Sequence, residues 1–123
     1  MSDDRGQATL ELALCLPLVA FLVAALVETG GIVSDQVRLW HAARDAVRTA
    51  VVDPDAAAVD RAAEDAGLHP LDITISPAPA LRTAGRPLTV SVRYRPAARL
   101  PLVGGLFDDF TLNARATMRI EVP

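Results

Sequence analysis

The chain is poor in the residue types on which many catalytic and metal sites depend. Its 123 residues include one cysteine and two histidines, and only 4% are aromatic. The lone Cys15 cannot form an internal disulfide, so a disulfide-stapled domain is excluded. Neither His41 nor His69 has a second His or a Cys at metal-ligand spacing, so we expect no metal site. With so few aromatic residues, the core must be built from Ala, Val and Leu.

Motifs for other common functions are missing as well. The sequence has no Gly-rich phosphate loop, no nucleophile elbow and no Ser with a suitably placed His. Its formal net charge is −3 and its basic residues form no cluster, which argues against nucleic-acid binding. The Asp108-Asp109 pair is typical of a solvated turn. We therefore expect no enzyme activity, no cofactor and no nucleic-acid partner.

What the chain does have is a long apolar run close to its start. Between Glu11 and Glu28 every residue is uncharged. As a helix this run is about 24 Å long at 1.5 Å per residue, which is short for a hydrocarbon core of about 30 Å. It reaches a full span only if residues 8–10 and 30–33 take part, with both glutamates near the interfaces. Pro17 predicts a kink inside the run, and Cys15 is typical of a small apolar filler.

Glu11 is the residue in this run that most needs a physical reason. An anchor helix or a secretory signal would place a basic residue there, and the leader before it is net acidic. A carboxylate in low dielectric takes up a proton or pairs with a cation. Cleavage after Gly6 would create an α-amine at Gln7, one helical turn from Glu11. Such a cut would supply the missing cation.

The stretch Gly6-Gln7-Ala8-Thr9-Leu10-Glu11, followed by Leu16-Pro17-Leu18, resembles the start of TadE-like pseudopilins of the tight-adherence (Tad) pilus system. The likeness continues through residues 27–30 and 41–48 and returns in residues 114–121. The family carries a type IV prepilin signal, in which a short polar leader ends in Gly and a Glu is the fifth mature residue. Leu12 departs from the pattern, because the family usually has an aromatic residue there. Leu12 and the long C-terminal region both favour a minor pilin over the filament subunit.

The resemblance implies a division of the chain and a set of partners. Residues 1–6 would be a leader removed by a prepilin peptidase, residues 7–33 a transmembrane and assembly helix, and residues 34–123 an extracytoplasmic domain. The other partners would be Tad pilins or pseudopilins, the membrane assembly platform and lipid, with Glu11 acting in assembly.

The resemblance also implies a location. The protein would be a single-pass protein of the cytoplasmic membrane, with its N-terminus inside and its C-terminal domain outside, and it could pass to the pilus or cell surface. Counting basic residues alone favours the opposite orientation, because Arg38, Arg44 and Arg48 follow the span. The chosen orientation therefore rests on the family, whose peptidase must reach Gly6 from the cytoplasm.

Two interpretations from other classes stay open beside this one. The chain could be a secreted binding module whose apolar run is an ordinary signal peptide cut near Ala25. The acidic start and the missing small-residue cleavage site count against it. It could also be a single-pass accessory or regulatory protein that is never processed.

Beyond the apolar run, the hydrophobic period stays helical to about Val52, which predicts an amphipathic stem. The core face of this stem is expected to consist of Val33, Val37, Trp40, Ala43, Val47, Ala50 and Val51. We expect Trp40 to anchor the core. Asp53 and Pro54 then predict the N-cap and first residue of a second helix, which Gly67 ends.

After Gly67 the period changes to two, which predicts strands over residues 71–76, 88–95 and 110–122. Their connections favour an antiparallel meander, and the stem is the only long apolar stripe that can cover it. The sequence therefore predicts an α+β fold. A long N-terminal membrane-spanning helix continues as a stem, followed by a short helix and a three-stranded antiparallel sheet packed on the stem, as in pilins.

The connection between the second and third strands, residues 96–109, is unusually apolar. Its apolar side chains are those of Leu100, Leu102, Val103, Leu106 and Phe107. An exposed apolar loop can mark a partner surface. Folding back over the open end of the sheet is the other explanation, and the sequence does not separate the two.

Overall fold

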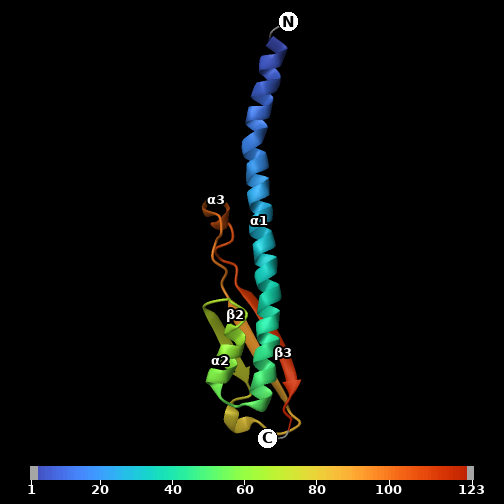
Figure 1. The fold of residues 1–123 in the computed structure, drawn as a ribbon, viewed down its shortest axis with the longest axis vertical. Helices are drawn as coiled ribbons and strands as arrows, with labels where there is room; N and C mark the ends of the chain where they lie inside the picture. The colour runs from blue at the N-terminus through green and yellow to red at the C-terminus, as the bar shows by residue number, and fades with distance from the viewer. Residues whose placement is uncertain (1–2, 122–123) are drawn as a thin grey trace. The chain divides into compact units, whose positions relative to one another are not determined.

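The computed structural model describes residues 3–121 and gives the surroundings of the side chains from residue 6 on. The elements are α1 (Asp3–Val52), α2 (Ala56–Glu64), β1 (Leu71–Ser76), the 3-10 helix η1 (Pro79–Leu81), β2 (Pro87–Tyr94), α3 (Pro101–Gly104) and β3 (Leu112–Arg119) (Figure 1). The predicted α+β fold is confirmed, with its long apolar N-terminal helix, short second helix and three-stranded antiparallel sheet.

The described residues form two compact units. The first consists of residues 3–31 together with Ala97–Asp108, and the second of Ile32–Pro96 together with residues 109–121. The first unit therefore contains α3, and the second contains α2 and the whole sheet. α1 contributes residues to both units.

The sheet of the second unit is an antiparallel meander with the strand order β1-β2-β3. Ile73 pairs with Val92, and Val92 pairs with Ala114, so apolar side chains from all three strands lie on one face. On the other face Ser91 pairs with Arg115, whose side-chain Nε donates a hydrogen bond to the serine hydroxyl at 3.3 Å. The predicted alternation of an apolar and a polar face is confirmed.

Helices α1 and α2 cover the apolar face. The core consists of Leu39, Ala42, Ala43, Ala46, Val47 and Ala50 from α1, Val59 and Ala63 from α2, and Leu68, Leu88, Val90, Val92, Leu112 and Ala114. Because so many of the helical core residues are alanines, the helix backbones can approach the sheet closely. Small side chains and branched strand residues thus fill the interior without aromatic rings.

The buried face of the stem agrees with the prediction only in part, because Ala43, Val47 and Ala50 are buried as predicted. Leu39 is fully buried, whereas Trp40 is 59% exposed and the predicted core residues Val33 and Val37 are exposed too. The observed stripe runs through positions 39, 42, 43, 46, 47 and 50, which is a regular helical spacing. Alanine occupies positions 42, 43, 46 and 50 of this stripe, whereas the indole of Trp40 lies on the exposed side. The prediction that Trp40 anchors the core is therefore wrong.

The second helix begins two residues later than predicted. Asp55, rather than Asp53, is the N-cap of α2, and its Oδ1 accepts a hydrogen bond from the Ala57 N–H at 3.1 Å. The Asp53 carboxylate instead accepts from the Asp55 N–H at 2.9 Å, so Pro54 lies in an Asx turn ahead of the helix. At the other end α2 stops at Glu64 with Asp65 as its C-cap, so Gly67, whose φ is 75°, lies two residues beyond the cap and not directly after it as predicted.

The third strand is shorter than predicted. β3 begins at Leu112, which pairs with Tyr94, the last residue of β2. A strand ends where its partner stops supplying backbone hydrogen bonds, so Phe110 lies before β3 and is half exposed. The expected last apolar residue, Val122, lies outside the described residues.

Candidate functional site

The predicted processing site lies at the start of α1. Gly6, Gln7 and Glu11 are all exposed on this helix, and a Cβ added at Gly6 would meet no atom within 4 Å. Positions 7 and 11 are four residues apart, so they lie on the same face of the helix, one turn from each other. An amine at Gln7 would therefore be within reach of the Glu11 carboxylate.

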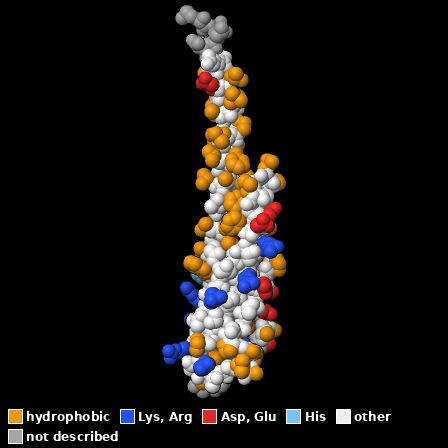
Figure 2. Space-filling model, turned by 180° about the vertical axis from the view of Figure 1, so that it is seen from behind, with side chains coloured by type: hydrophobic (Ala, Val, Ile, Leu, Met, Phe, Trp, Pro, Cys, Tyr) orange, Lys and Arg blue, Asp and Glu red, His pale blue; other side chains and the backbone are white. Residues whose placement is uncertain are grey.

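The apolar run of α1 is exposed rather than packed. Its exposed large side chains include Leu12, Leu14, Leu16, Leu18, Phe21, Leu22 and Leu26. Figure 2 shows hydrophobic side chains along this part of the helix. Cys15 is exposed as well, and Pro17 lies inside the helix, which continues past it.

This helix is long and apolar enough to cross a membrane, and its most apolar window is not buried against the rest of the described chain. These features are consistent with a single-pass membrane anchor. A removable signal sequence near the N-terminus would show the same features, so the helix alone does not separate the anchored interpretation from the secreted one.

Glu28 has surroundings that the sequence did not reveal. Its side chain is only 1% exposed, and its Oε1 accepts a hydrogen bond from the backbone N–H of Arg99 at 3.1 Å. The other carboxylate oxygen, Oε2, is buried and has no hydrogen-bond partner among the described residues. A carboxylate in such a place needs a positive charge nearby.

The basic side chain of Arg99 lies against the same face of α1. A Cβ added at Gly31 would collide with the Arg99 guanidinium, so this cation lies directly against the helix at Gly31. Gly31 follows Glu28 by three residues and therefore shares its face of α1. At Gly30, by contrast, an added Cβ would meet nothing within 4 Å. The glycine at position 31 thus makes room for the basic side chain that accompanies Glu28.

Arg99 begins the tip of the segment Ala97–Asp108, which we call the apolar loop. Within it, Val103 and Gly104 are buried, Leu102 is 91% exposed and Leu106 is 69% exposed. Leu100 and Phe107 are half-buried.

The sequence offered two explanations for this loop, a partner surface or a fold-back over the open end of the sheet. The core of the second unit contains no residue of the loop, which belongs to the first unit with residues 3–31. Its role as a partner surface stays a prediction.

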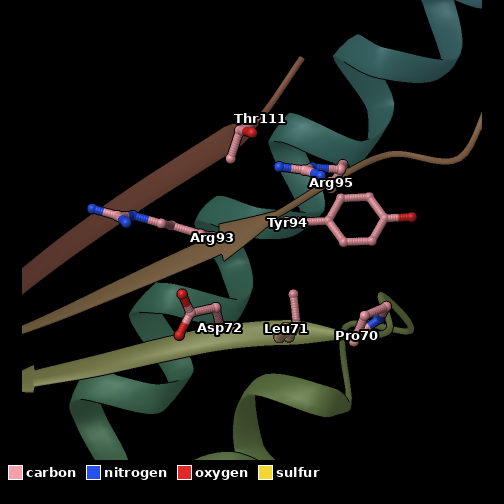
Figure 3. Close-up of a pocket in the computed structure, with 7 residues that line it drawn as sticks. All are labelled: Pro70, Leu71, Asp72, Arg93, Tyr94, Arg95 and Thr111. Carbon is pink, nitrogen blue, oxygen red and sulfur yellow. The ribbon is translucent and has the colours of Figure 1, made fainter. Parts of the chain in front are cut away.

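One hollow on the second unit illustrates the surface chemistry of the described residues. A hollow of about 400 Å³ is lined by Pro70, Leu71, Asp72, Arg93, Tyr94, Arg95 and Thr111 (Figure 3). In that view Arg93 and Tyr94 point in opposite directions from β2, and the lining has no nucleophile beside a base. Residues 3–121 contain no group of three or more His, Cys, Asp or Glu side chains that could hold a metal ion.

The structure therefore brings together some of the residues singled out from the sequence and leaves others apart. Gly6, Gln7 and Glu11 share one end of α1, and Pro17 lies farther along the same helix. The contact between Glu28 and Arg99, separated by 71 residues in the chain, was missed. The sequence signals that could have indicated this contact were Glu28, an acid at the end of an apolar helix, and Arg99, an arginine at the start of an apolar loop.

Comparison with known proteins places part of the chain beside a described family. Residues 6–48 match the family described as TadE-like protein, from Gly6 through the apolar run and Glu28 into the stem. No curated protein and no solved structure matches the chain. The resemblance predicted from the sequence is thereby confirmed over this stretch, and it supports a pilin-like role associated with Tad pilus systems. TadE-like proteins are structural proteins of the pilin type and not a family of enzymes.

Proposed function

We propose that this chain, which is TadE-like over residues 6–48, is a minor pilin that takes part in the assembly of a Tad pilus. The observation that carries the proposal is the position of the family match. It begins at the glycine that precedes an exposed apolar helix, and it extends over the whole apolar run. The family resemblance and the exposed helix thus concern the same residues.

In this proposal a prepilin peptidase cuts after Gly6. The new amine of Gln7 then neutralises Glu11, so the apolar helix can pack in the membrane or the pilus without a bare carboxylate at its head. Residues 7–33 would form the membrane and assembly helix, and residues 34–123 would lie outside the cytoplasm. Other Tad pilins and the membrane assembly platform would be its partners.

Processing is tested by sequencing the N-terminus of the protein recovered from bacterial membranes. The minor-pilin proposal expects the mature chain to begin at Gln7. A secreted binding module would begin near Glu28, and an unprocessed accessory protein at Met1 or Ser2. Either of the last two results would overturn the proposal.

A substitution at the cleavage site sharpens this test. Gly6→Ala is expected to slow or block maturation, because the leader of the family ends in Gly and the substitution adds a methyl group at the residue before the cut, so most of the protein should stay as precursor on an immunoblot. Gly30→Ala is the matched control, because it is also a helical glycine with open space for a Cβ. Cleavage of Gly6→Ala at the same rate as Gly30→Ala would contradict the proposed processing.

A further inference from the structure

The tip of the apolar loop has a composition that water disfavours. From Leu100 to Phe107 every side chain is apolar or absent, and the charged residues Arg99 and Asp108 flank this stretch. Val103 is buried, but Leu102 and Leu106 stand out with most of their surface exposed. Two large exposed leucines so close together are typical of a surface that meets another apolar phase.

Several backbone N–H groups of this tip are already hydrogen-bonded within the tip, which suits an environment with little water. The N–H of Gly104 donates to the carbonyl oxygen of Leu100 at 2.7 Å, and that of Phe107 donates to the carbonyl oxygen of Gly104 at 2.8 Å. The N–H of Leu106 donates to the carbonyl oxygen of Val103 at 3.1 Å. Pro101, at the start of α3, has no N–H to satisfy. Because unpaired backbone groups are costly away from water, these internal bonds lower the cost of entering a membrane interface.

Glu28 decides how far the membrane-spanning run can extend. If its carboxylate faced lipid, the run from Leu12 would end at Val27, at about 24 Å. With Glu28 buried and accompanied by Arg99, the next charged residue along α1 is Asp35. The run from Leu12 to Val33 then has about 22 residues and measures about 33 Å, which matches a hydrocarbon core of about 30 Å.

We infer that the apolar loop inserts into the lipid interface where α1 leaves the membrane, covers Glu28 and presents Leu102 and Leu106 to the acyl chains. This inference rests on the membrane anchoring in the proposed function. It gives the predicted partner surface a partner of defined chemistry, the lipid bilayer. Arg99 and Asp108, which flank the apolar tip, are suited to the headgroup region.

The position of the loop favours lipid over a protein partner. The loop and residues 3–31 belong to the same compact unit. Figure 1 shows the loop rising beside α1 with α3 at its tip, toward the apolar run. Leu26 and Val27 of α1 and Leu102 of the loop are all exposed, as the inference requires of side chains that meet lipid.

The test places single fluorescent probes on the full-length chain. In a Cys15→Ala background, Leu102→Cys reports on the loop, Val19→Cys on the span and Leu81→Cys on an exposed site in η1. Each variant is labelled with an environment-sensitive thiol dye and reconstituted into vesicles of phosphatidylethanolamine and phosphatidylglycerol. The vesicles carry nitroxide quenchers either near the headgroups or deep in the acyl chains.

The probe at position 102 is expected to be quenched several-fold more strongly by the shallow nitroxide than the probe at position 81, with position 19 quenched by the deep one. Quenching at 19 together with a probe at 102 that behaves like the one at 81 would overturn the loop inference and leave the anchoring intact. A blue-shifted probe at 102 without lipid quenching would show that protein covers the loop, which also overturns it. Absence of quenching at position 19 would refute the membrane anchoring and the inference with it.

Discussion

Two carboxylates border the apolar run of α1, and at the scale of single residues they meet the same electrostatic problem differently. Glu28 is covered within the chain, because the backbone N–H of Arg99 donates a hydrogen bond to its carboxylate. The Arg99 guanidinium lies beside Gly31, on the same face of the helix. Glu11 is exposed at the other end of the run. A cation for Glu11 has to be created, and the proposed cleavage after Gly6 is a means of creating it.

The two adjacent glycines of the apolar loop should respond differently to substitution. A Cβ at Gly104 would collide with the Ala98 side chain and lie 3.2 Å from its Cα, whereas a Cβ at Gly105 would meet nothing within 4 Å. Gly104→Ala is therefore expected to loosen the loop, so trypsin should cut after Arg99 several-fold faster in the full-length protein in detergent. Gly105→Ala should be cut at the original rate. Equal rates for the two variants would show that this close approach does not hold the loop closed.

At the scale of elements, the stem shows what a period alone can and cannot predict. Apolar residues at helical spacing correctly predict a helix from Ile32 to Val52. The period alone, however, does not fix which side of the helix faces the sheet. The buried face includes the predicted Ala43, Val47 and Ala50, but it continues through Leu39, Ala42 and Ala46. The predicted Val33, Val37 and Trp40 are exposed.

Neighbouring residues of the stem therefore make a sharp comparison. Leu39→Ala should lower the free energy of unfolding by about 2–5 kcal/mol, because it leaves a cavity against the sheet. Trp40→Ala should change it by about 0.5 kcal/mol or less, because the indole is largely exposed. Urea unfolding of the full-length protein in micelles, followed by circular dichroism, measures both. A larger loss for Trp40→Ala than for Leu39→Ala would contradict the buried face described above.

At the scale of the whole molecule, the fold class and the strands could be predicted from local periods. The alternation of Ile73 and Ile75 with polar neighbours needs only nearby residues, and so does the apolar run of α1. The contact of Glu28 with Arg99 depends on a tertiary approach over 71 residues, which no local pattern encodes. The predicted start of α2 was wrong for a local reason. Asp53 and Asp55 are both good N-cap residues, and the Asx turn at Asp53 leaves Asp55 as the cap.

The proposed role in pilus assembly concerns the whole molecule, and a substitution of Glu11 tests it. Glu11→Ala should still be cleaved after Gly6 but should enter pili much less, because the pairing with the new amine is lost. The control is Glu64→Ala, which removes an exposed carboxylate from α2. Immunoblots of sheared pili and of membranes measure the two pools. Normal incorporation of Glu11→Ala would remove the pairing argument while leaving the processing site untouched.

The long sequence separation between Glu28 and Arg99 also sets an order of events during synthesis. At about 5–20 residues per second, a ribosome needs about 4–14 s to extend the chain by the 71 residues that lead from Glu28 to Arg99. For that interval the nascent helix carries an acid whose cover has not yet been translated. With the proposed membrane anchoring, insertion would begin with Glu28 still hydrated, and the final depth of the helix would be set only after Arg99 emerges. Any copy of the chain that stops short of Arg99 would keep that acid uncovered.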